Sequence, residues 1–194
     1  EGARARVFMQ GRSGWLQVDG YAGFDQLFNA PGSQLVEVGC LAHCRRKYKE
    51  ALDGGDVRAA VVLQVIAKLY RIEDEATEAN LNPEARLALR LEKSRPLVYE
   101  IGAWIAKIHP QAPPKSPLGQ AVGYTLNQWR QLNRFLEDGR LELDNTGAER
   151  ALRAVALGRK NFLFAGSDEG ARTAAVYYSV FGTCALLGLD EAAG

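Results

Sequence analysis

The stretch Trp15-Leu16-Gln17-Val18-Asp19-Gly20 decides how the first part of this chain folds. It is a short apolar run that ends in an acid and a glycine, and this pattern predicts a buried strand. A second short strand is expected over residues 34–40, and helical patterns follow the two strands at 21–29 and 43–52. Strand and helix therefore alternate twice, which favours a right-handed parallel crossover.

The composition is that of an ordinary folded protein. Of 194 residues, 47% are hydrophobic and 24% are charged, which excludes a disordered tail or a collagen-like chain. The formal net charge of +1 says little about partners, because a near-zero sum can conceal a basic face. We expect no membrane span, since no run of about 18 apolar residues is present. The three Cys and the missing signal peptide favour a cytoplasmic location.

The middle of the chain, 57–138, is predicted to be an all-helical block without internal repeats. Apolar residues recur there at helical spacing. Helices are expected to begin at Pro83 behind Asn82 and to restart around Pro96, and one long helix should run from Ser116-Pro117 to Gly139. Mixed structure returns afterwards, with a helix from 146 to about 157 and a final helix capped by Ser167.

Asp19 is the first candidate for chemistry. It stands at the carboxyl end of a predicted strand, where open sheets place their ligands. With Gly20 after it, its carboxylate can present both oxygens to a hard cation. The alternative is that Asp19 caps the helix that follows.

Glu149 is the second candidate. On a helix it shares a face with Arg153, and Arg150 lies beside them. The carboxylate could ligate a metal while the guanidinium groups hold phosphate oxygens. The alternative is a capping box, in which the Glu149 side chain reaches back to the backbone of Thr146.

Basic residues flank both acids, as a phosphodiester site requires, although each cluster alone is also typical of a solvated face. The candidate DNA-binding residues are His43, Arg45, Arg46, Lys47, Arg150, Arg153, Arg159 and Lys160. Cys40, His43 and Cys44 resemble part of a zinc site, but a closed site needs four ligands. Packed thiols at a strand–helix junction are therefore the preferred interpretation, with His43 near the strand ends.

Five ordered blocks resemble bacterial transposases of the insertion-sequence sixty-six family. The resemblance covers nearly the whole chain. The blocks are Leu16–Phe24, Gly39–Tyr48, Pro114–Gly119, Asp144–Arg153 and Ala156–Ser167. Departures are mild: Thr146 stands where the family usually has a second Asn, Ala154 where Pro is common, and Cys44 where a small residue is frequent.

The resemblance implies a ribonuclease H-like domain whose Asp-Asp-Glu triad binds two divalent metals, Mg²⁺ or Mn²⁺. Water and then a DNA 3′-hydroxyl attack phosphodiesters in line. By position, Asp19 corresponds to the second aspartate and Glu149 to the glutamate. The fold class implied is α/β and mostly helical: a partial catalytic core at 1–56, a helical insertion at 57–138, and the core continued over 139–194.

No residue here matches the family's first aspartate, which lies on an earlier strand. The chain begins with Glu rather than Met, and we expect the carboxyl-terminal portion of a bacterial transposase, inactive alone. Transposon ends and target DNA are the expected partners, with a homo-oligomer forming on DNA. One alternative is a truncated remnant that only binds DNA or another protein. The other is a self-sufficient nuclease in which Asp144 supplies a third carboxylate.

Overall fold

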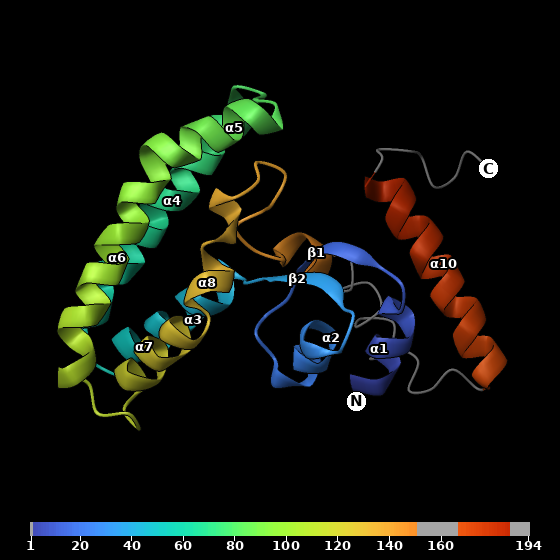
Figure 1. Cartoon of the computed structure of the whole chain (residues 1–194), viewed down its shortest axis with the longest axis horizontal. Coiled ribbons are helices and arrows are strands. Elements are labelled where there is room, and N and C mark those ends of the chain that lie inside the picture. Colours follow the sequence, from blue (N-terminus) through green and yellow to red (C-terminus); the bar gives the residue numbers. More distant parts are fainter. Residues whose placement is uncertain (1, 151–166, 187–194) are drawn as a thin grey trace. The chain divides into compact units, whose positions relative to one another are not determined.

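The computed structural model describes residues 2–150 and 167–186, and the chain divides into two compact units, Glu1–Asn145 and Thr146–Gly194 (Figure 1). The first unit holds a small parallel sheet and a helical block. The described part of the second unit is helical. The described residues are therefore mostly helical with two parallel strands, within the α/β class that the sequence predicts.

The sheet forms from the segments that the sequence identifies. Strands β1 (Ser13–Gln17) and β2 (Gln34–Val38) pair in parallel, with Gln17 opposite Val38. The crossover between them carries a 3₁₀ turn η1 (Ala22–Phe24) and α2 (Asp25–Asn29), so the predicted crossover is confirmed. Helix α1 (Gly2–Met9) precedes β1.

The prediction of a buried strand over residues 15–20 is wrong in part, because β1 covers Ser13–Gln17 and none of these residues is buried. Ser13, Gly14 and Trp15 are exposed, and Trp15 keeps 38% of its surface accessible. Burial is reached at Val18, whose N–H donates to Val38 O at 2.9 Å just beyond the paired residues. Among the strands that the structure describes, β1 has one hydrogen-bonded neighbour, β2.

Helices of the first unit enclose one apolar core (Figure 1). In chain order they are α3 (Leu41–Asp53), η2 (Val57–Ala59), α4 (Ala60–Glu78), α5 (Pro83–Leu89), the π turn η3 (Arg90–Ser94), α6 (Arg95–Ile108), η4 (His109–Gln111), α7 (Pro117–Asn127), α8 (Trp129–Leu132) and η5 (Arg134–Leu136). The apolar stripes face inward as their spacing predicts: Val62, Ile66, Leu69, Ile105, Leu118 and Val122 are almost fully buried.

The helix that begins at Pro83 does not stop before Pro96, contrary to the expectation. Asn82 caps it as predicted, since its Oδ1 accepts from Ala85 N at 2.9 Å. A π turn, Arg90–Ser94, then leads directly into α6, whose first turn contains Pro96. Because proline lacks an N–H, it fits at this position, where the hydrogen-bond spacing changes.

The single helix expected from Ser116 to Gly139 is also incorrect. Ser116 caps α7 as predicted, with Gly119 N donating to its Oγ at 3.0 Å. The chain then breaks at Gln128 and Asn133 into α7, α8 and η5. One cause is tertiary: Gly39 N, at the end of β2, donates to Gln131 O at 2.9 Å.

The second unit is described over 146–150, which are helical, and over α10 (Asp168–Leu186). The predicted cap is confirmed, because Gly170 N donates to Ser167 Oγ at 3.0 Å. The predicted helix up to residue 157 lies mostly outside the described residues. None of the described helices combines the length and the apolar composition needed to cross a membrane.

Candidate functional site

The carboxyl ends of β1 and β2 meet at one edge of the sheet. Asp19 lies two residues after β1, and Cys40 two residues after β2. Helix α3 begins directly after Cys40 and places His43 in its first turn. Since ligands of parallel sheets bind beyond the carboxyl ends of the strands, this edge is the candidate site.

The Asp19 carboxylate is fixed by a turn and reaches solvent. Its Oδ1 accepts from Tyr21 N at 3.1 Å, and its side chain is 39% exposed. The bond ends at Tyr21, ahead of η1, so Asp19 closes a turn and does not cap α2. Gly20 has φ +75°, and a Cβ there would lie 3.1 Å from Gln128 Cδ, so this position favours glycine.

His43 connects Cys40 with Asp19. Its Nδ1 lies 3.1 Å from Cys40 Sγ, and its Nε2 lies 4.0 Å from Asp19 Oδ2. Burial raises the pKa of the Cys40 thiol, so sulfur stays protonated near neutrality. Burial likewise raises the pKa of Cys44 to about 11, and that thiol contacts Thr125 Oγ1 at 3.4 Å in the core. Both cysteines are thus packed thiols, as expected.

The segment after the helical block returns to this edge. Gln17 Nε2 donates to Gly39 O at 3.1 Å and to Glu142 O at 3.0 Å, so one side chain joins both strand ends to that segment. Next to it, Tyr70 OH donates to Asp144 Oδ2 at 2.5 Å. A second carboxylate, Asp144, therefore lies close enough to Cys40 for its charge to raise the pKa of that thiol further, beyond the effect of burial.

Helix α3, which begins at this edge of the sheet, carries basic residues in its second turn. Arg45 and Arg46 are exposed, whereas Lys47 is half-buried with Nζ 5.0 Å from the centre of the Tyr124 ring. Tyr124 OH in turn donates to Asp19 O at 2.9 Å. Burial raises the pKa of Tyr124, so the phenol remains a donor at physiological pH.

The other candidates belong to the second unit. Glu149 and Arg150 are exposed residues of the helical stretch 146–150. Arg153, Arg159 and Lys160 lie outside the residues that the structure describes. Within 2–150 and 167–186, no group of three His, Cys, Asp or Glu side chains is arranged to hold a metal ion.

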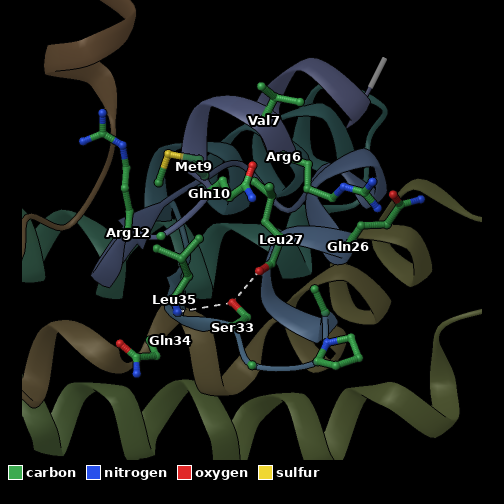
Figure 2. Close-up of a pocket in the computed structure, with 14 residues that line it drawn as sticks. Arg6, Val7, Met9, Gln10, Arg12, Gln26, Leu27, Ser33, Gln34 and Leu35 are labelled. Atoms are coloured by element: carbon green, nitrogen blue, oxygen red, sulfur yellow. Dashed lines mark hydrogen bonds between the residues drawn. The ribbon is translucent and has the colours of Figure 1, made fainter.

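A separate hollow of about 640 Å³ lies beside the amino ends of the strands. Figure 2 shows Arg6, Arg12, Leu27 and Leu35 around it, and Ser33 closes its turn by donating to Leu27 O at 2.6 Å. Because it adjoins the end of the sheet opposite Asp19, it does not extend the candidate site.

Comparison with known families decides the assignment. The sequence model of the family described as "Transposase IS66 family" matches residues 1–173, most of the chain. The chain belongs to the IS66 transposase family. The match includes Asp19, Glu149 and all eight candidate DNA-binding residues.

Three relatives of the IS66 chain come from Sinorhizobium fredii, and each is 36% identical to it. They are the uncharacterized proteins y4hP, y4jD and y4qI, matched over 99%, 92% and 94% of this chain and over 37%, 35% and 34% of their own lengths. The chain therefore spans little more than a third of these relatives. No solved structure matches it.

Three residues of the candidate site were not predicted from the sequence. Tyr124 falls outside the apolar stripe that predicts its helix, and its bond to Asp19 spans 105 positions. Gln17 has no signal beyond its place just before Val18-Asp19. Tyr70 likewise falls outside the apolar stripe of α4. Such contacts between distant segments leave no local pattern.

Proposed function

We propose that this chain forms part of the catalytic core of a DNA transposase, with Asp19 and Glu149 among the carboxylates that bind divalent metal. The supporting observation is the position of Asp19. It is held by a turn at the carboxyl end of a parallel strand, with its side chain 39% exposed, in a member of the IS66 family. In the complete enzyme the reaction is cleavage of a phosphodiester followed by strand transfer.

A ribonuclease H-like core interrupted by a helical insertion is consistent with the path of the chain. After the helical block of 57–138, Leu143 O accepts from Leu41 N at 2.9 Å, and Glu142 O accepts from Gln17. The chain thus returns to the sheet that it left. We propose 1–56 and 139–194 as the two halves of the core.

The residues at the edge suit a hard divalent cation. Mg²⁺ and Mn²⁺ prefer carboxylate oxygens, and one Asp19 oxygen is bound by backbone while the other faces His43 at 4.0 Å. Two such ions would activate the attacking oxygen and stabilise the leaving oxygen. The chain leaves nearly two-thirds of the length of the longer relatives unmatched. We propose that the remaining carboxylate corresponds to a residue in that unmatched part.

Charge around Asp19 supports a DNA substrate. Arg45 and Arg46 are exposed on the helix that begins at this edge, and Lys47 lies over the ring that bonds Asp19. Cations at these positions neutralise phosphates. We propose the same role for His43 and, in the second unit, for Arg150, Arg153, Arg159 and Lys160.

Calorimetric titration with Mn²⁺ tests the assignment. We expect weak binding that Asp19→Asn abolishes, because amide oxygen is a much poorer ligand for a hard cation. Asp25→Asn makes the same change of charge on α2 and serves as the control. Mn²⁺ binding that survives Asp19→Asn, or that is lost equally in both variants, would contradict the metal role.

A non-catalytic DNA-binding or interaction module is the second candidate. The exposure of Arg45 and Arg46 favours it, because these bases could bind DNA without any metal. It predicts sequence-indifferent, salt-dependent binding that persists in EDTA and in Asp19→Asn but weakens in Arg150→Ala/Arg153→Ala. Binding that requires metal and Asp19 favours the catalytic core instead.

A further inference from the structure

A hollow of about 810 Å³ lies along one side of α7. Its walls are α7, the turn 109–114 and Lys47 of α3. Tyr124 belongs to this wall, and its hydroxyl donates to Asp19 O at 2.9 Å. We call this hollow the α7 groove. It therefore adjoins the candidate site through a direct hydrogen bond.

The lining of the α7 groove is polar and carries a cation. Among the residues that the structure describes, no carboxylate lines the groove. Its polar side chains are one ammonium, one imidazole, one phenol and three amides: Lys47, His109, Tyr124, Gln111, Gln120 and Asn127. A surface that is cationic and rich in amides, without acids, favours a polyanion whose backbone is charged and whose edges form hydrogen bonds.

The cation of the groove is held in place by its surroundings. Lys47 is half-buried, and its Nζ lies 5.0 Å from the centre of the Tyr124 ring. This contact and the bond from Tyr124 to Asp19 fix the ammonium beside the edge of the sheet. A phosphate in the groove would thus be neutralised close to the proposed metal site.

The wall of the groove is shaped before any ligand binds. Ser116 Oγ donates to Pro113 O at 2.7 Å and accepts from Gly119 N at 3.0 Å, which locks the turn to α7. A Cβ at Gly119 would lie 2.0 Å from Pro113 O, so only glycine permits this close packing. The turn therefore presents a rigid wall.

Gly123 gives α7 a flat face. It lies between Gln120 and Asn127, both exposed, and a Cβ added there would meet no atom within 4 Å. A helix face without a side chain at its centre lets a polymer backbone approach the helix closely. The amides on either side are then placed to contact sugar, phosphate or base edges.

We infer, on the basis of the function proposed above, that the α7 groove holds the DNA strand leading to the phosphate that reacts at Asp19. The groove supplies contacts from the helical block in addition to the basic residues of α3. Lys47 contacts a phosphate, and Gln120 and Asn127 contact the strand along α7.

Charge placed at Gly123 tests this inference. Gly123→Lys and Gly123→Glu both replace a helical glycine that faces open space, so both variants are expected to fold. In fluorescence anisotropy with a short DNA of mixed sequence, we expect the Lys variant to bind about tenfold tighter than the Glu variant at 0.1 M salt. The slope of the logarithm of the binding constant against the logarithm of the salt concentration should differ between the two variants by at least about one unit.

Gly182 provides the matched control, because it lies in α10 and a Cβ there also meets no atom within 4 Å. Gly182→Lys and Gly182→Glu should bind DNA alike. Equal shifts at both positions would overturn the inference, because they would report net charge alone. So would competition by polyglutamate as effective as that by DNA.

The outcomes separate the groove from the proposed function. If the wild-type protein binds DNA and the two Gly123 variants bind it with equal affinity, the inference about the α7 groove is refuted and the metal role of Asp19 is unaffected. If the two Gly123 variants differ in DNA affinity while Asp19→Asn leaves Mn²⁺ binding unchanged, the groove is supported as a DNA site and the catalytic role of Asp19 is refuted. Absence of DNA binding at low salt overturns the groove, and Mn²⁺ titration then decides the metal role by itself.

Discussion

Tyr124 donates its phenolic hydrogen to the backbone carbonyl of Asp19 at 2.9 Å, across 105 positions of the chain. This bond joins the helical block to the turn that holds the candidate metal ligand. It also fixes the Tyr124 ring, which the Lys47 ammonium contacts. The geometry of Asp19 thus depends on a residue of α7 and not only on its own strand.

Tyr124→Phe should lower the free energy of unfolding by about 1 kcal/mol, the usual contribution of one such hydrogen bond. It should also weaken Asp19-dependent Mn²⁺ binding, since the turn loses a support. Urea denaturation and calorimetry measure the two effects. Tyr99→Phe, at a residue 66% exposed, is the control. A Tyr124→Phe protein that equals wild type in both measurements would show that the bond has no role.

Gly20→Ala should destabilise the protein by about 1–2 kcal/mol, because φ is +75° at this position. A further loss is expected from the contact with Gln128, 3.1 Å from the added Cβ. Gly32→Ala separates the two causes, since Gly32 has φ +78° and open space around it. Gln128→Ala in the Gly20→Ala background should restore the second part. Equal losses at both glycines would contradict the steric contribution.

Arg90→Met should cost about 3–5 kcal/mol, because it leaves a buried carboxylate without its main partner. Arg90 is fully buried, and its Nη2 donates to Glu73 Oε2 at 2.7 Å. Its Nη1 also donates to Phe135 O at 2.9 Å. Thermal or urea unfolding measures the loss, and exposed Arg95→Met is the control. A loss below that of an ordinary surface substitution would refute the role of the pair.

Protonation of the Glu73 carboxylate should lower the free energy of unfolding in acid. Burial alone would raise its pKa, but the hydrogen bonds and charges of Arg90 and Arg86 lower it below the usual 4.5. A depressed carboxyl pKa stabilises the fold above pH 4.5, and this contribution is lost as pH falls through the pKa of the folded state. Urea unfolding across this range should show a weaker pH dependence in Glu73→Gln. An unchanged pH dependence would assign acid sensitivity to other groups.

Cys184 should be the first thiol to react in the native protein. Cys40 and Cys44 are buried and burial raises the pKa of both, whereas Cys184 is partly exposed on α10. Titration with a chromogenic disulfide at pH 8 should detect one fast thiol and two more after unfolding. The fast thiol should disappear in Cys184→Ser. Three equally fast thiols would show that the core opens readily.

The local features of this fold were predictable from sequence. The strands and their parallel crossover follow from two apolar runs, each followed by a helical pattern. The caps Asn82, Ser116 and Ser167 also form as expected, because a cap depends on residues within one turn. Asp19 was singled out for the same reason, since its place after β1 is a local property.

The failures concern contacts between distant segments. Pro96 suggested a helix boundary, but the π turn before it carries Arg90, whose partners lie 17 and 45 positions away. The break at Gln128 accompanies the bond from β2 to Gln131. Tyr124 was missed because its bond to Asp19 has no local signature. Sequence periodicity contains none of this information.

The uninterrupted helical run formed by α5, η3, α6 and η4 acts as a strut of roughly 40 Å. One end, at His109 and Gln111, forms a wall of the α7 groove. Near the other, Arg86 and Arg90 bind Glu142 and the carbonyls of Phe135 and Asp138. The length of one helical run, rather than any loop, therefore sets the spacing between the α7 groove and the segment 135–142.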